Sequence, residues 1–256
     1  MIEALLTSLL TTQSLFIVIG SFFISIMAVL VGGSMFFSVP FIQFFFPGSS
    51  FGVIVGNIKV GSLFRGIGST ASTYKHIDFK AVLPMFALAF IGTIMGASLI
   101  SNIDQIWLIP AIIVAIILAL FAPTIANKIS KKTFRIASFG AGFYAGIFGA
   151  GIGLLLIALL RVKYPREDQI AHVKIQARFA ELLLVISAVI THILHGNIIA
   201  AIWIPWSIGA LVGGYFAGII LHKIGKLPGK TQMILLYTAF AVALLAAIVN
   251  SAGPLN

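Results

Sequence analysis

The chain contains no cysteine and very little acid: six of its 256 residues are Asp or Glu. Without cysteine it can form no disulfide framework, thiol nucleophile or thiolate metal site. Only 9% of the residues are charged, against about 25% in an ordinary soluble domain. The HExxH, GxSxG and P-loop patterns are also missing, and no nucleophile–base pair or metal cluster can be assembled. We therefore expect neither an enzyme nor a cofactor.

Hydrophobic residues, in contrast, make up 60% of the chain. Several apolar stretches approach about 20 residues, the length that crosses a bilayer as a helix. The sequence therefore predicts an all-α, polytopic helical membrane protein of the cell membrane. A net charge of +10 would indicate nucleic acid binding in a soluble protein, but most of the basic excess lies in short loops. We expect the lipid bilayer, and no nucleic acid, as a partner.

Two of the apolar stretches are interrupted by glycine. The first, residues 15–46, is broken at residues 32–34 and again at Pro40; the second, 136–160, is broken at 149–153. Backbone freed from a helix at membrane depth needs other protein or a watered cavity to satisfy it. Transporters place such breaks at the substrate site, whereas close helix packing is the plainer use of glycine. We interpret the breaks as functional because they occupy matching places in an internal repeat.

The repeat has a period of 119 residues. This shift superposes Asn57 on Gln176 and Lys59 on Arg178, and it aligns the two glycine breaks. We therefore predict two repeats, residues 1–126 and 127–256, each with a broken hairpin and three transmembrane helices. An odd number of crossings in each repeat inverts the second copy relative to the first. The expected helices span residues 51–73, 82–100, 107–126, 169–193, 198–221 and 232–249.

The basic loops decide the orientation. If the second broken stretch crossed the membrane once, the twelve loop Lys and Arg residues would divide equally between the two sides. If it enters and returns, as a re-entrant hairpin or as two short spans, all twelve lie on one side. The positive-inside rule then makes that side cytoplasmic, with both termini outside.

Four basic residues remain inside predicted helices, and they are Lys59, Arg65, Lys174 and Arg178; Glu181 is the only acid there. A charge at the bilayer centre costs about 2.5–3.5 kcal/mol, so each should face a partner or a wet cavity. The plain interpretation of Arg65 is an ion pair with Glu181, and that of Lys174 is snorkelling to the membrane surface. Because one acid cannot neutralise four bases, the surplus positive charge predicts an anion.

We predict that a pseudo-two-fold axis brings Lys59 and Arg178 to one midplane site between the hairpins, assisted by Arg65 and Lys174. Guanidinium can grip two oxygens of a carboxylate, phosphate or sulfonate, and lysine adds a point charge. Arg65 follows Lys59 by six residues, about 240° around a helix, so the two are not expected to share a face. Further hydrogen-bond donors are expected at Asn57, Gln176, Gly33, Ser34, Gly151 and Gly153. Either side-chain amide is equally well explained as an interhelical clasp.

The glycine motifs carry a family resemblance. The first reads Val-Gly-Gly-Ser-Met-Phe-Phe-Ser-Val-Pro over 31–40, and the second reads Gly-Ile-Phe-Gly-Ala-Gly-Ile-Gly over 146–153. In these motifs the chain resembles the TauE/SafE family of sulfite and organosulfonate exporters, also called toluene sulfonate uptake permeases. Members usually show a Gly-Gly-Gly run, which Ser34 alters in the first motif and Ala150 and Ile152 interrupt in the second. The resemblance covers almost the whole chain, and it implies transport of sulfite, sulfoacetate or a related sulfonate.

We therefore expect a secondary transporter that exports a small sulfur oxyanion by alternating access between the two repeats. An inside-negative potential alone favours export of a monoanion by about 2.3 kcal/mol per 100 mV. The sequence leaves open an anion channel with the same basic lining and a transporter of another small carboxylate or oxyanion. It also leaves open a homodimer.

The orientation can be tested by membrane-impermeant labelling at Lys128 and Lys226. We expect both to react from the cytoplasmic side, because inverted repeats place all basic loops there. Reaction of the two residues from opposite faces would rule out the inversion and the shared midplane site.

Overall fold

The computed structural model describes residues 11–30, 34–101, 133–149, 152–164 and 170–224, together with isolated positions between 110 and 130. Every regular element in these ranges is helical, which confirms the predicted all-α class. Only isolated positions of the helix predicted at 107–126 are described. The helix predicted at 232–249 lies outside the described residues.

Two broken hairpins alternate with longer helices along the chain. The first half contains α2 (Thr12–Leu30), α3 (Met35–Phe45), α4 (Phe51–Thr73), the 3₁₀ turn η1 (Tyr74–His76) and α5 (Phe79–Ser101). The second half contains α7 (Phe134–Ile147), α8 (Ile152–Arg161), α9 (Ile170–Leu194) and α10 (Ala200–Ile224). Both glycine breaks therefore fall between helices, where the sequence predicts them.

The predicted second interruption of the first stretch, at Pro40, is wrong. Pro40 is buried inside α3, and the helix continues past it to Phe45. Proline loses the hydrogen bond that its own N–H would donate, but its fixed φ of about −65° is helical. The chain therefore turns once in this stretch, between α2 and α3.

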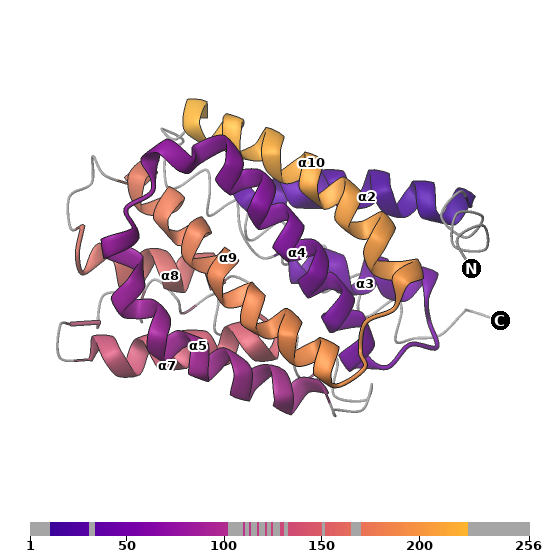
Figure 1. Cartoon of the computed structure of the whole chain (residues 1–256), viewed down its shortest axis with the longest axis horizontal. Helices are drawn as coiled ribbons and strands as arrows, with labels where there is room; N and C mark the ends of the chain where they lie inside the picture. The colour runs from indigo at the N-terminus through magenta and orange to yellow at the C-terminus, as the bar shows by residue number, and fades with distance from the viewer. Residues whose placement is uncertain are drawn as a thin grey trace.

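The helices are arranged in layers (Figure 1). α4 and α9 lie at the centre, with the α2–α10 pair on one side and the α5–α7 pair on the other. Most of α4 is buried, including Lys59 and Arg65. The central position of α4 explains how it carries two cations that an outer helix facing lipid could not hold.

Glycines set the close approach and the direction of the outer pairs. In the α5–α7 pair, a Cβ on Gly92 would lie 2.4 Å from the carbonyl oxygen of Phe139, and one on Gly96 would lie 2.1 Å from that of Phe143. A step of four residues along α5, from Gly92 to Gly96, matches a step of four residues in the same direction along α7. The two helices therefore run parallel. The α2–α10 pair shows the same pattern, with Gly209 against Val18 and Gly213 against Phe22.

The second hairpin begins and ends at the same end of the bundle. Since α7 runs parallel to α5, it starts near the turn that follows η1. The chain returns to this turn after α8, where the Tyr164 hydroxyl donates to Asp78 Oδ2 over 2.5 Å. With 10 residues, α8 is about 15 Å long, half the hydrocarbon thickness of a bilayer.

The first hairpin begins and ends at the opposite end of the bundle. Gln13 Nε2, in the first turn of α2, donates to the carbonyl of Phe45 at the end of α3 over 3.2 Å. This end also holds the start of α4, where Asn57 contacts the turn between α9 and α10. The two hairpins therefore enter the bundle from opposite ends.

The outward faces of the bundle are apolar. Four helical segments are long and apolar enough to cross a membrane, and these are Thr12–Leu30, Val82–Ser101, His172–Leu194 and Ala200–Leu221. Large hydrophobic side chains such as Phe23, Leu99 and Phe216 are exposed on them. An exposed apolar surface of this kind is what lipid covers, so the chain is a polytopic helical membrane protein.

The glycine contact between α5 and α7 gives a stability test with a control in the same helix. A Cβ on Gly142 would lie 1.9 Å from the carbonyl oxygen of Ala89, whereas one on Gly140 would meet nothing within 4 Å. We expect Gly142→Ala to destabilise the protein by about 1–3 kcal/mol, because the helices must separate. Gly140→Ala should be neutral or slightly stabilising. Thermal unfolding in detergent measures both, and equal midpoints for the two variants would contradict the close crossing.

Candidate functional site

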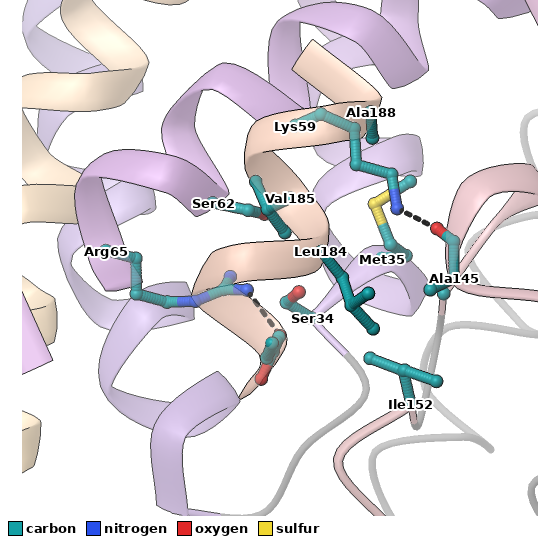
Figure 2. A pocket seen from close by; sticks show the side chains of 12 residues that line it. Ser34, Met35, Lys59, Ser62, Arg65, Ala145, Ile152, Leu184, Val185 and Ala188 are labelled. Carbon is teal, nitrogen blue, oxygen red and sulfur yellow. Dashed lines mark hydrogen bonds and ion pairs between the residues drawn. The ribbon is translucent and has the colours of Figure 1, made fainter. Parts of the chain in front are cut away.

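A small cavity lies where the two hairpins meet the central helices (Figure 2). Both hairpins and both central helices contribute to its lining, which consists of Ser34, Met35, Lys59, Ser62, Arg65, Ala145, Gly149, Ile152, Glu181, Leu184, Val185 and Ala188. Its volume of about 20 Å³ is roughly room for one water molecule. The cavity is therefore too small to hold a sulfite ion in this conformation.

One carboxylate joins two arginines beside this cavity. Glu181 Oε1 lies 3.2 Å from Arg65 Nη2, and its Oε2 lies 2.6 Å from Arg178 Nη1. Arg65 is only 6% exposed and the Glu181 side chain 14%, so water screens these charges weakly. With Lys59, which is 4% exposed, three positive charges face one negative charge. The cluster keeps a net positive charge that no described carboxylate balances.

Lys59 is held by backbone carbonyls and not by a carboxylate. Its Nζ donates to the carbonyl oxygen of Ala145 over 2.6 Å and to that of Phe148 over 3.3 Å, at the end of α7. These carbonyls carry the negative end of the helix dipole. An ammonium group has three N–H donors, so one remains for a ligand in the cavity that Lys59 lines.

Both half-helices begin at the cavity. Met35, the first residue of α3, and Ile152, the first residue of α8, are part of its lining. The first turn of a helix presents unpaired N–H groups and a partial positive charge. Arg178 lies over the start of α8, because a Cβ on Gly153 would come within 3.1 Å of its Nη1. Helix N-termini and cations at one place form an environment that attracts an anion.

Lys59 and Arg65 line the same cavity, which corrects the expectation that they do not share a face. Ser62 lies between them on α4 and also lines the cavity. Ser62 and Arg65 follow Lys59 by three and six residues, so they lie about 60° and about 120° from it around the helix axis. Both side chains are long enough to reach the lining of one cavity, where Figure 2 shows Lys59 extending toward Ala145.

Asn57, one of the predicted donors, does not line the cavity. Its Nδ2 donates to the carbonyl of Asn197 over 3.0 Å, and its Oδ1 accepts from the N–H of Ile199 over 2.9 Å. Asn57 therefore clasps the turn between α9 and α10, which is the interhelical role that the sequence left open.

Gln176 makes the corresponding clasp at the other end. Its Nε2 donates to the carbonyl of His76 over 2.6 Å, and its Oε1 accepts from the N–H of Asp78 over 2.8 Å. Tyr164 adds the hydrogen bond to the Asp78 carboxylate. Burial and this contact raise the pKa of Tyr164 to about 12, so the phenol keeps its proton near neutral pH.

Of the remaining candidates, Ser34 lines the cavity, and Gly153 lies in the first turn of α8 beside Arg178. Lys174 is buried but does not line the cavity, and within the described ranges it forms neither an ion pair nor a hydrogen bond. Gly33 and Gly151 lie outside the described residues.

Ser62 and the carbonyls of Ala145 and Phe148 are part of the site but were not predicted from the sequence. Ser62 could have been predicted, because it follows Lys59 by three residues and so lies near it on the same helix. The two carbonyls could not, because every residue has a carbonyl and nothing in the sequence distinguishes these.

The family model described as sulfite exporter TauE/SafE matches residues 17–250 of the chain. The chain belongs to the TauE/SafE family. No curated protein and no solved structure matches it. TauE/SafE proteins are membrane transporters, which agrees with the apolar outer faces of the bundle. The net positive charge at the cavity agrees with the name of the family, because sulfite is an anion.

Removal of the Glu181 carboxylate tests the charge cluster. We expect Glu181→Ala to destabilise the protein by about 3–5 kcal/mol, because it leaves the buried Arg65 and the partly buried Arg178 without a carboxylate. The double variant Arg65→Ala/Glu181→Ala should recover part of this loss, since one unpaired charge is gone. Chemical unfolding in detergent measures both variants. A loss below about 1 kcal/mol, as for an exposed pair, would show that water already solvates the cluster.

Proposed function

We propose that this chain is a secondary transporter that exports a small sulfur oxyanion or organosulfonate, such as sulfite or sulfoacetate. One observation carries the proposal: buried Lys59 and Arg65 and the starts of two half-helices line one cavity that contains a single carboxylate. Family membership supports the substrate class. The membrane potential then contributes to export, because an inside-negative voltage drives an anion outward.

In this proposal the anion binds between α4, α9 and the two hairpins. Each guanidinium has five N–H donors, and Arg65 and Arg178 each donate one hydrogen bond to Glu181. The remaining donors, the third N–H of Lys59 and the backbone N–H groups at the starts of α3 and α8 suit the several oxygens of a sulfonate. Neither Arg178 nor Lys174 lines the cavity itself. Arg178 is assigned a part because it contacts Glu181 at the cavity edge, whereas Lys174 makes no such described contact and takes no direct part.

The small volume of the cavity supports alternating access more than an open channel. A volume of about 20 Å³ holds about one water molecule, so a sulfite ion requires the walls to move apart. The amide clasps of Asn57 and Gln176 lie at opposite ends of the bundle, and both are formed. We infer that opening of one clasp at a time exposes the cavity to one side of the membrane.

The two halves of the chain, residues 1–126 and 127–256, supply the moving parts of this mechanism. Their hairpins enter from opposite ends, as an inverted repeat requires. We propose that the end with the turn after η1 is cytoplasmic, because the basic loops gather there, and that both termini are outside.

Transport can be measured as flux of labelled sulfoacetate or sulfite in proteoliposomes. We expect Arg65→Ala and Arg178→Ala each to reduce flux by about tenfold or more, since a hydrogen bond to a charged group contributes about 1.5–3 kcal/mol. Lys75→Ala, which removes an exposed loop cation, should retain wild-type flux. Each arginine variant leaves Glu181 paired with the other arginine, so a folding defect should not dominate.

Competition in the same assay separates the substrate classes. Unlabelled sulfonates should compete more strongly than carboxylates or phosphate. Saturation and counterflow are expected of a transporter, whereas single-channel currents would indicate a channel. Unchanged flux in both arginine variants would reject the proposed site.

A further inference from the structure

The C-terminal end of α7 contains carbonyl groups that the helix itself does not use. In a regular helix the N–H of Gly149 would bond to the carbonyl of Ala145. Here it bonds to the carbonyl of Tyr144 over 2.9 Å, because the backbone leaves the helix at Phe148, whose φ is −134°. The turn therefore frees the Ala145 carbonyl at a buried position, and a buried carbonyl needs a donor.

An ammonium group from another helix occupies this place. Lys59 of α4 brings its Nζ to the carbonyl oxygens of Ala145 and Phe148, at 2.6 and 3.3 Å. A Cβ at position 149 would lie 2.9 Å from that Nζ, so the absence of a side chain there makes room for the ammonium. Within the described ranges Lys59 forms no ion pair. Carbonyl dipoles and the helix end are what stabilise its charge.

Carbonyls at an unwound half-helix end are also the groups that coordinate Na⁺ in secondary transporters. We propose that the end of α7 is a monovalent-cation site, which the chain fills with its own Lys59 ammonium in place of a dissolved coupling cation. The wild-type protein then requires neither Na⁺ nor K⁺. Loss of the Lys59 ammonium opens the site to Na⁺ or NH₄⁺ from solution.

Two other cations of the bundle, the partly buried Arg178 and the buried Lys174, show that this environment is particular to Lys59. Arg178 occupies the same place in the second half of the sequence, but it binds the Glu181 carboxylate. Lys174 is buried to a similar degree and has no such carbonyl contacts among the described residues. Lys174 therefore provides a matched control, since its removal deletes a buried ammonium without opening a carbonyl site.

Thermal unfolding in detergent tests the site without any substrate. Wild type, Lys59→Ala and Lys174→Ala are compared in sodium, ammonium and choline chloride at equal concentration and pH. Choline is the control cation because it is bulky and has no N–H donor. In Lys59→Ala we expect midpoints about 2–4 °C higher in sodium or ammonium than in choline, as for a ligand in excess over its Kd. Wild type and Lys174→Ala should show no such difference. Equal midpoints for Lys59→Ala in all three salts, or the same salt effect in the other two proteins, would overturn the proposal.

A flux measurement gives a second, independent test, and this test alone rests on the proposed function. Wild-type flux should be equal in sodium, potassium and choline salts. Lys59→Ala should lose flux in choline and regain at least about threefold in sodium. A sodium requirement in the wild type would overturn the proposal even if Lys59→Ala does not fold. Absence of sulfonate flux in the wild type would count against the proposed function, and the unfolding test would still decide the cation site.

Discussion

The structure depends on how the charges of two buried cations, Lys59 and Arg65, and of the partly buried Arg178 are stabilised with a single described carboxylate. Glu181 contacts Arg65 and Arg178 together, and the end of α7 supplies the carbonyls for Lys59. Isolated charges are expensive in the membrane interior, so these contacts hold α4, α9 and the second hairpin in one arrangement. They also leave the centre of the bundle net positive. The contacts that stabilise this arrangement of helices thus also leave a positive charge that favours an anion.

The half-helices follow from the need to satisfy backbone groups away from water. A break at membrane depth exposes N–H groups at the start of one helix and carbonyls at the end of another. At the second break, Lys59 binds the carbonyls, while the start of α8 remains at the cavity. The break is therefore stabilised on its negative side and open to a ligand on its positive side. This division allows the proposed cation and anion sites to lie close together.

The sequence predicts the helices well because their ends are set locally. Length, apolarity and the Ser50 cap, which accepts from the N–H of Val53, define the start of α4 without reference to the rest of the fold. The site was less predictable. Asn57 and Gln176 have the residue types of ligand-binding groups, and only the packing shows that they clasp turns. The shared cavity of Lys59 and Arg65 depends on side-chain reach, which a helical-wheel angle does not contain.

The likeness of the two clasps has a consequence for the energetics of opening. Asn57 and Gln176 each give one hydrogen bond to a carbonyl and accept one from an N–H in the turn they hold. These two contacts are alike in kind at both ends, and other contacts of each end, such as that of Tyr164 with Asp78, come in addition. The two amide clasps by themselves therefore create no built-in preference for one side of the bilayer. In the transport cycle that we propose, concentration and voltage across the membrane would then set the net direction.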